Sequence, residues 1–356
     1  MVNPDHSWFI CSFPYQLAIK EGLFSRDDIA DQMLDDDFNE IKWSMEMEAV
    51  FWGDSDGTFF SYETVAKNRK LQYPMLPDEL SVKLGNSTHL RIPQKTPGEK
   101  RILSIDLALM ASTKHNNDAS ALFINQMVPT RAGRYMNNIV YAETTEGGHT
   151  AEQAVRVRKL FDQYQCDYLV IDARGVGFGI LDSLLTDLTD PETGEIYPAL
   201  SCYNNPEIAA RCTSKNAEKV IWAINASQKF NSECAVKLRE GFRQGRIRLL
   251  ETEYDADALL GEIKGYNQLP VSDKLKMKLP YINTTLLINE LVSLQHEETS
   301  GNIKIKERSN MRKDRYSSLS YNYWVSTQIE STLKRKNRNS DVSDGSFLFR
   351  APKLRA

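Results

Sequence analysis

The chain has 356 residues, of which 41% are hydrophobic and 10% aromatic, and its formal net charge is −4. This length and composition suffice for a buried core and for two domains. No run of about 18 uncharged apolar residues could span a bilayer, and the first residues lack a signal-peptide pattern, so we expect an intracellular protein. The cysteines form no CxxC or CxxH pair, which argues against a zinc finger or a disulfide framework.

Charge is unevenly distributed along the chain. Aspartates are frequent between residues 27 and 37, whereas lysine and arginine are frequent between residues 304 and 315 and again between 334 and 338. The acidic run is typical of a solvated helix face or loop. The first basic run surrounds Asp314, and a basic margin beside an acidic site is what a polyanionic substrate requires.

The N-terminal part is predicted to be helical. Residues 1 to about 70 look amphipathic, with a turn at residues 53–57. The prolines between Pro74 and Pro97 then indicate a linker, which we place at residues 76–98.

From residue 100 onward the pattern alternates between strands and helices. Apolar runs predict strands at residues 101–107, 120–126, 138–143 and 167–172, and apolar residues at helical spacing predict a helix over 150–164. Three consecutive strands, a helix and a further strand ending in an acid form the opening pattern of an RNase H-like sheet. The predicted fold class is therefore α/β, a mixed sheet flanked by helices.

The remainder is predicted to be mostly helical. We expect helices at residues 179–188, 214–230, 233–244, 284–297 and 314–333, with a hairpin contribution around 246–250 and 302–306. The basic, Ser- and Asn-rich residues 334–356 are predicted to form a disordered tail.

Three aspartates are the best indication of function. Asp106 ends the strand in ILSIDLA, Asp172 ends the strand in YLVID, and Asp314 opens the helix in RKDRYSSLSY. Taken singly, Asp106 is equally consistent with a turn, and Asp314 with an ordinary helix start. Together they could form an all-oxygen site of the kind that holds Mg²⁺ or Mn²⁺, and two such ions about 4 Å apart catalyse phosphodiester hydrolysis.

The glycine-rich run ARGVGFG that follows Asp172 admits two explanations. A dinucleotide-binding loop would need glycine where Ile180 stands and would lie in the first strand–helix unit. A tight turn that brings the Asp172 carboxylate to the sheet edge needs glycine for steric reasons alone, and we prefer this explanation.

These segments resemble a known family. ID at 105–106, NDASA at 117–121, LVIDARGVG at 169–177 and KDRYSSLSY at 313–321 look like the nuclease domain of large terminase subunits, the DNA-packaging motors of tailed bacteriophages. The resemblance implies an RNase H-like nuclease domain over residues 99–333 that binds two Mg²⁺ or Mn²⁺ ions and cuts concatemeric double-stranded DNA. It places the catalytic metal ligands at Asp106, Asp172 and Asp314, with Asp118 as an auxiliary ligand.

The resemblance extends to residues 1–75, which look like the end of the motor's ATPase domain. The chain contains no GxxxxGK[ST] loop and no GK dipeptide, so we expect no ATP hydrolysis by this chain alone. In the full motor the implied partners are double-stranded DNA, a small terminase subunit and a portal, with oligomerisation only on assembly. The implied location is the cytoplasm of a bacterial host that carries the phage or prophage.

Basic residues near the acids are candidate phosphate contacts. They are Arg174, Arg312, Lys313 and Arg315, with Arg243, Arg246 and Arg248 as more distant candidates. A solvated helix face is the better explanation of any one of them alone. No base-reading motif is evident, so we expect cutting to be largely indifferent to sequence.

Two other classes of function stay open at this point. The chain could be another RNase H-like enzyme, such as an integrase or a junction resolvase. It could also be a non-catalytic DNA-binding or docking module of a packaging machine. The histidines lie outside the three acidic motifs, and no HExxH or GxSxG is present, which disfavours a histidine-based mechanism.

Overall fold

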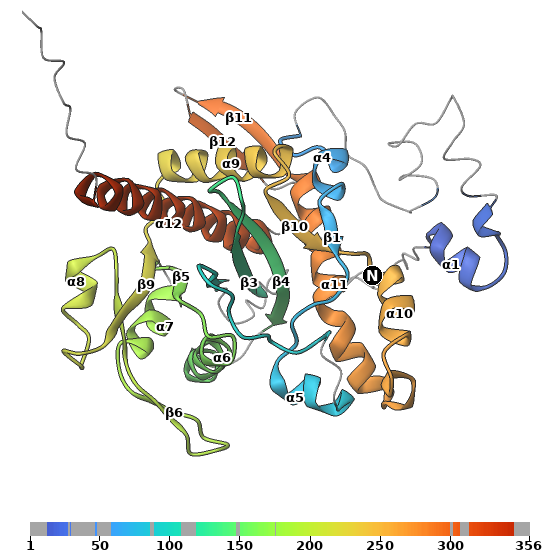
Figure 1. Ribbon diagram of the computed structural model, residues 1–356, viewed down its shortest axis with the longest axis horizontal. Coiled ribbons are helices and arrows are strands. Elements are labelled where there is room, and N and C mark those ends of the chain that lie inside the picture. Colours follow the sequence, from blue (N-terminus) through green and yellow to red (C-terminus); the bar gives the residue numbers. More distant parts are fainter. Residues whose placement is uncertain are drawn as a thin grey trace, which may run out of the picture.

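The computed structural model describes residues 13–27, 29, 47, 58–85, 89–107, 119–146, 150–174, 176–299, 302–306 and 313–344. Figure 1 shows strands at the centre of the molecule, with the long helix α12 (Asp314–Asp344) lying across them.

One eight-stranded sheet has the strand order β1-β10-β4-β3-β2-β5-β9-β8. Its strands are β1 (Arg69–Leu71), β2 (Lys100–Asp106), β3 (Ala119–Pro129), β4 (Tyr135–Glu146), β5 (Tyr168–Asp172), β8 (Leu200–Cys202), β9 (Glu218–Ile224) and β10 (Ile247–Leu250). β2, β3 and β4 pair antiparallel, whereas β5 runs parallel to β2 and β9 runs parallel to β5. This arrangement confirms the predicted α/β class, a mixed sheet flanked by helices.

Helices cover both faces of this sheet. The described residues form the helices α1 (Tyr15–Lys20), α4 (Tyr62–Ala66), α5 (Asp78–Ser81), η1 (Val82–Leu84), α6 (Thr150–Gln163), α7 (Val176–Leu184), α8 (Pro206–Ala209), α9 (Gln228–Arg243), α10 (Glu253–Gly261), η2 (Tyr266–Gln268), α11 (Val271–Ser293) and α12. α6 and α7 pack on the face that carries Leu103 and Ile105, and α9 and α12 pack on the face that carries Ile102. Because side chains alternate along a strand, Asp106 lies on the same face as Ile102, beneath α12.

Two small hairpins lie outside the central sheet. β6 (Leu188–Thr189) pairs with β7 (Ile196–Tyr197), and β11 (Gln295–Thr299) pairs with β12 (Asn302–Lys306). The second hairpin lies beside α9 (Figure 1), and the backbone N–H of Ile303 donates to the Ser232 hydroxyl of that helix at 2.9 Å. Within the described ranges, no helix combines the length and the apolar character needed to cross a membrane.

A buried polar seam fixes α12 to the sheet. Asn322 donates to the Ser104 hydroxyl at 3.0 Å and accepts a hydrogen bond from Asn125 at 2.8 Å, and the hydroxyls of Ser104 and Ser318 lie 3.0 Å apart. Buried polar groups must be paired to avoid their desolvation cost, so these bonds set the position of α12 along β2 and β3. Gly241 of α9 allows close packing against α12, because a Cβ at this position would lie 2.5 Å from the Tyr323 ring.

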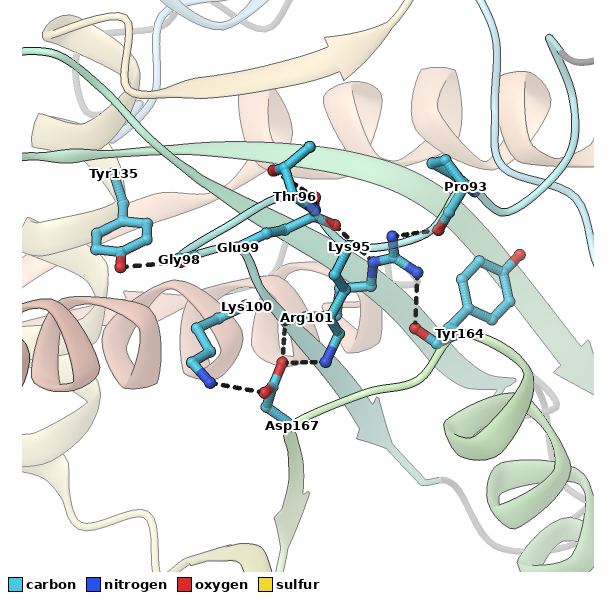
Figure 2. Close-up of polar contacts among 10 residues, drawn as sticks. All are labelled: Pro93, Lys95, Thr96, Gly98, Glu99, Lys100, Arg101, Tyr135, Tyr164 and Asp167. Carbon is cyan, nitrogen blue, oxygen red and sulfur yellow. Dashed lines mark hydrogen bonds and ion pairs between the residues drawn. The ribbon is translucent and has the colours of Figure 1, made fainter.

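At the start of β2 the polar groups form a closed ion-pair network, drawn in Figure 2. Asp167 accepts hydrogen bonds from Lys95 at 2.7 Å and from Lys100 at 2.9 Å, and its Oδ2 also accepts the backbone N–H of Arg101 at 2.8 Å. The fully buried Arg101 guanidinium donates to Glu99 at 2.7 Å. The carbonyl oxygens of Tyr164 and Pro93 accept its two remaining nitrogens. These contacts tie the segment before β2 to the strand that follows α6.

The described residues between 58 and 98 pack into the same core. Leu76, Leu80, Leu84 and Leu90 are buried in it, and β1 pairs parallel with β10. The leucines between the prolines of the predicted linker at residues 76–98 are apolar enough to bury. The division into an ATPase remnant and a nuclease domain stays a prediction.

Some predicted elements in the C-terminal half are wrong. Residues 218–224 form the strand β9 and not part of a helix over 214–230, and α9 begins at Gln228 after the Ser227 cap. The segment EKVIWAI is rich in β-branched and aromatic residues, which suit a strand between two neighbours.

Of the hairpin contribution predicted around residues 246–250 and 302–306, the first part is wrong and the second is confirmed. β10 joins the central sheet parallel to β4, whereas β12 pairs with β11. The helix predicted over 284–297 begins at Val271 and ends at Ser293. Pro280 lies inside this helix, and proline usually marks a helix boundary. The last helix continues to Asp344, beyond its predicted end at 333.

Candidate metal centre

Asp106 and Asp172 end neighbouring parallel strands. β2 and β5 pair in the register Ile105 with Ile171, so the two aspartates follow at equivalent positions. Both lie on the sheet face beneath α12, and both line one cavity of about 420 Å³. Asp106 and Asp172, which were predicted to belong to one site, therefore lie at the same end of neighbouring strands.

The Asp172 carboxylate is held by the turn that follows it. The backbone N–H of Arg174 donates to Asp172 Oδ1 at 3.1 Å, and the Arg174 Nε lies 3.6 Å from the same oxygen. A Cβ at Gly177 would lie 1.8 Å from the Asp172 carbonyl oxygen. Glycine is thus required where α7 passes the end of β5, as the steric explanation of the glycine run proposed.

The pKa of the Asp106 carboxyl is raised from 3.8 to about 7, by burial and by the negative charges of Asp314 and Asp172. Hydrogen bonds from the Ser317 side chain and from the backbone N–H of Leu107 act in the opposite direction. Burial also raises the pKa of Asp172, although Arg174 offsets part of the effect. Carboxylates that repel one another in this way are stabilised by a cation placed among them.

Asp314 is the first residue of α12, and its charge acts on Asp106. It does not line the cavity itself. In the described part of the chain, no group of three or more His, Cys, Asp or Glu side chains is gathered closely enough to hold a metal ion. The charges of Asp172 and Asp314 therefore act on Asp106, but the three carboxylates are not gathered closely enough to coordinate one ion together.

The remaining cavity wall is polar and basic. Lys313 and Ser317 of α12 line it on one side, and Lys304 of β12 lines it on the other. Tyr321 and the start of α9, with Asn231, complete it, and the Tyr321 hydroxyl donates to Asn231 at 3.1 Å.

Ser317, Tyr321 and Asn231 line the cavity without having been predicted as site residues, whereas Lys304 belongs to the basic run predicted beside Asp314. Ser317 could have been found, because it stands three residues after Asp314 on a predicted helix and so shares its side of the helix. Asn231 and Lys304 reach the cavity only through the packing of α9 and the second hairpin.

The predicted phosphate contacts differ in their surroundings. Arg174 and Lys313 line the cavity. Arg315 lies 3.5 Å from Glu290 with a side chain only 12% exposed, and Arg246 pairs with Glu330, so both have structural partners. Arg243 lies 3.9 Å from Glu240, and Arg248 is exposed on β10. Asp118 and Arg312 lie outside the described residues.

The donor set fits a hard divalent cation. Mg²⁺ and Mn²⁺ prefer carboxylate oxygens, and the repulsion that raises the Asp106 pKa is the kind that such an ion relieves. Lysines at the rim add positive charge where a phosphate could approach.

The fold resembles nuclease domains of phage large terminases. The large terminase nuclease from thermophilic phage G20c with bound magnesium is 14% identical at a TM-score of 0.40, over 76% of this chain and 97% of that chain. The nuclease domain from Thermus phage P74-26 is 14% identical at a TM-score of 0.41, over 75% and 94%. The HK97 bacteriophage large terminase is 10% identical at a TM-score of 0.38, over 75% of this chain and 43% of that chain. No family model and no curated protein matches the chain.

At these identities the likeness assigns neither a substrate nor a metal to this chain. The chemistry of the site therefore rests on the residues that form it.

Proposed function

We propose that this chain is a divalent-metal-dependent DNA endonuclease, with Asp106, Asp172 and Asp314 as its catalytic carboxylates. The observation that carries this proposal is the pair Asp106 and Asp172 in one cavity, with the Asp314 charge raising the pKa of Asp106. Burying an acid without a cationic partner costs folding free energy. Acids in such surroundings are common at functional sites.

The chain's own groups would hold and orient the reacting parts. Asp106, Asp172 and Asp314 supply the oxygen ligands for Mg²⁺ or Mn²⁺, and Ser317 fixes the Asp106 carboxylate by its hydrogen bond. When bound, two such ions supply an activated water and stabilise charge on the phosphate and the leaving oxygen. Asp118 stays proposed as an auxiliary ligand.

Basic residues at the rim would position the DNA backbone. Lys313 and Lys304 stand on different elements that border the cavity, and Arg174 stands beside Asp172. Contacts of this kind neutralise phosphates without reading bases. We therefore expect cleavage that is weakly dependent on sequence and strongly dependent on salt.

The test is cleavage of plasmid DNA with Mg²⁺ or Mn²⁺. Asp106→Asn and Asp172→Asn should each fold and should reduce cutting to background, because the amide removes a negative oxygen ligand. Asp167→Asn is the matched control, since it changes an aspartate at the other end of β5 whose partners are lysines, and it should keep cutting. Undiminished cleavage by either site variant would refute the assignment.

We also propose that the substrate is concatemeric double-stranded DNA during phage genome packaging. This part rests on the resemblance of the quoted motifs, with a small terminase subunit and a portal as the implied partners. Comparing linear duplex with branched DNA tests it, because preference for a four-way junction would favour the resolvase alternative instead.

A further inference from the structure

The backbone N–H of Ser317 donates to the carbonyl oxygen of Lys313 at 2.8 Å, so Lys313 occupies the N-cap position of α12. A lysine side chain carries donors only and cannot accept a backbone N–H, as a serine or aspartate at this position would. Asp314 stands at the first position of the first turn.

A side chain from another helix accepts a backbone N–H of this first turn. Glu290 of α11 is 5% exposed, and its Oε1 accepts the backbone N–H of Tyr316 at 2.7 Å. Its Oε2 lies 3.5 Å from Nη1 of Arg315. Glu290 therefore contacts the two residues that directly follow Asp314.

The position of Glu290 is electrostatically demanding. The pKa of Glu290 is raised from 4.5 to about 8, because burial and the Asp314 charge raise it more than the Tyr316 N–H and Arg315 lower it.

We propose that Glu290 is a positioning residue that holds the first turn of α12, and with it Asp314 and Ser317, in the geometry needed for metal binding. This inference rests on the proposed nuclease function. Glu290 is not placed among the ligands, since its oxygens are directed to Tyr316 and Arg315.

The chain contains a matched control. Glu330 lies further along α12, is 6% exposed, accepts the backbone N–H of Tyr135 at 3.3 Å and pairs with Arg246. It thus combines burial, a backbone N–H and an arginine as Glu290 does, but it holds a part of the helix that lies away from the acids.

The experiment measures Mn²⁺ binding by calorimetry without DNA, alongside thermal unfolding and plasmid cleavage. Glu290→Ala should raise the Mn²⁺ dissociation constant and the Mn²⁺ concentration for half-maximal cleavage by about 10- to 100-fold, as loss of a residue that orients metal ligands typically does. Glu330→Ala should lower the unfolding temperature while leaving Mn²⁺ affinity within about twofold of wild type.

Two further variants separate positioning from folding. Glu290→Gln keeps an oxygen that can accept the Tyr316 N–H and should restore most of the Mn²⁺ affinity. Glu290→Asp keeps the carboxyl group but is shorter by one methylene. It should fold, but it should bind Mn²⁺ more weakly than the wild-type protein does.

Wild-type Mn²⁺ affinity in Glu290→Ala or Glu290→Asp would overturn the inference, as would a Gln variant no better than Ala. These outcomes leave the nuclease proposal intact as long as the wild-type protein cuts and Asp172→Asn does not. A wild-type protein that neither binds Mn²⁺ nor cuts would instead refute the proposed function itself.

Discussion

The two ends of strands β2 and β5 carry acids in opposite electrostatic environments. At the start of the strands, burial alone would raise the pKa of Asp167, but hydrogen bonds from Lys95 and Lys100 outweigh it and lower that pKa. At the far end, burial and neighbouring acids raise the pKa of Asp106 to about 7. The same pair of strands thus carries one acid whose charged form the fold stabilises (the satisfied end) and one whose charged form it destabilises (the strained end).

This difference separates structural acids from functional ones. An acid with lysine partners stabilises the folded state at neutral pH, whereas an acid surrounded by other acids destabilises it until a cation binds. Figure 2 shows the satisfied end, where every acid meets a cation.

At the satisfied end, Arg101→Met should destabilise the protein by about 3–5 kcal/mol, the usual result of breaking a buried ion pair from one side. Glu99, whose side chain is 1% exposed, would keep a charge without its cation. The carbonyl oxygens of Tyr164 and Pro93 would also lose their donor. Chemical denaturation at pH 7 measures the change.

Arg156→Met is the control for this variant. Arg156 is 34% exposed and pairs with Glu143 at 2.8 Å, so its loss should cost about 1 kcal/mol or less. Equal losses in the two variants would contradict the view that the start of β2 is held by buried ion pairs.

At the strained end, Asp106→Asn should stabilise the metal-free protein at pH 8. The folded pKa is raised from 3.8 to about 7, so between these values the folded state keeps a proton that the unfolded state has lost. Stability therefore falls as pH rises through this window, and the loss is complete above pH 7. Asparagine carries no such loss.

Because solvent partly screens a charge that lines a cavity, we expect a gain on the order of 2 kcal/mol and not the full conversion at about 1.4 kcal/mol per pKa unit. Thermal unfolding with a chelator at pH 4 and pH 8 measures it, and the gain should vanish at pH 4. Asp167→Asn should have the opposite sign at pH 8, since the lowered pKa of Asp167 contributes stability at neutral pH. A destabilised Asp106→Asn protein at pH 8 would show that Asp106 is satisfied within the fold.

The smallest effect concerns the pH dependence of metal binding. Because Asp106 must lose its proton to act as a ligand, Mn²⁺ affinity should rise by about tenfold per pH unit below pH 7 and level off above it. Calorimetry between pH 5.5 and pH 8 in buffers of different ionisation enthalpy would also detect the released proton. An affinity that stays constant from pH 5.5 to pH 7 would contradict the raised pKa of Asp106.

Local patterns predicted the first half of the sheet well. The apolar runs before Asp106 and Asp172 form β2 and β5, and the helix over 150–164 corresponds to α6. These segments are short, strongly apolar and bounded by polar turns, so their period is readable. The helix predicted over 214–230 was wrong, because pairing with β5 stabilises the strand β9 as much as the propensities of its own residues do.

The candidate site divides in the same way. The chain order of Asp106, Asp172 and Asp314 and their flanking residues were visible in the sequence. Asn231 and Glu290 were not, because each reaches the site or the start of α12 through contacts between elements far apart in the chain. Lys304 was visible only as part of a basic run.

The sequence by itself determined that Asp106 and Asp172 end buried strands, because strand length and alternation are local properties. Only the tertiary structure decided that these acids lie side by side beneath α12, with Lys95 and Lys100 far from them at the other end of the strands. Strand pairing sets the register of β2 and β5, and the buried seam of Ser104 and Asn322 sets the place of α12. A carboxylate's pKa depends on the charges within a few ångströms, and those charges come from parts of the chain that meet only when it folds.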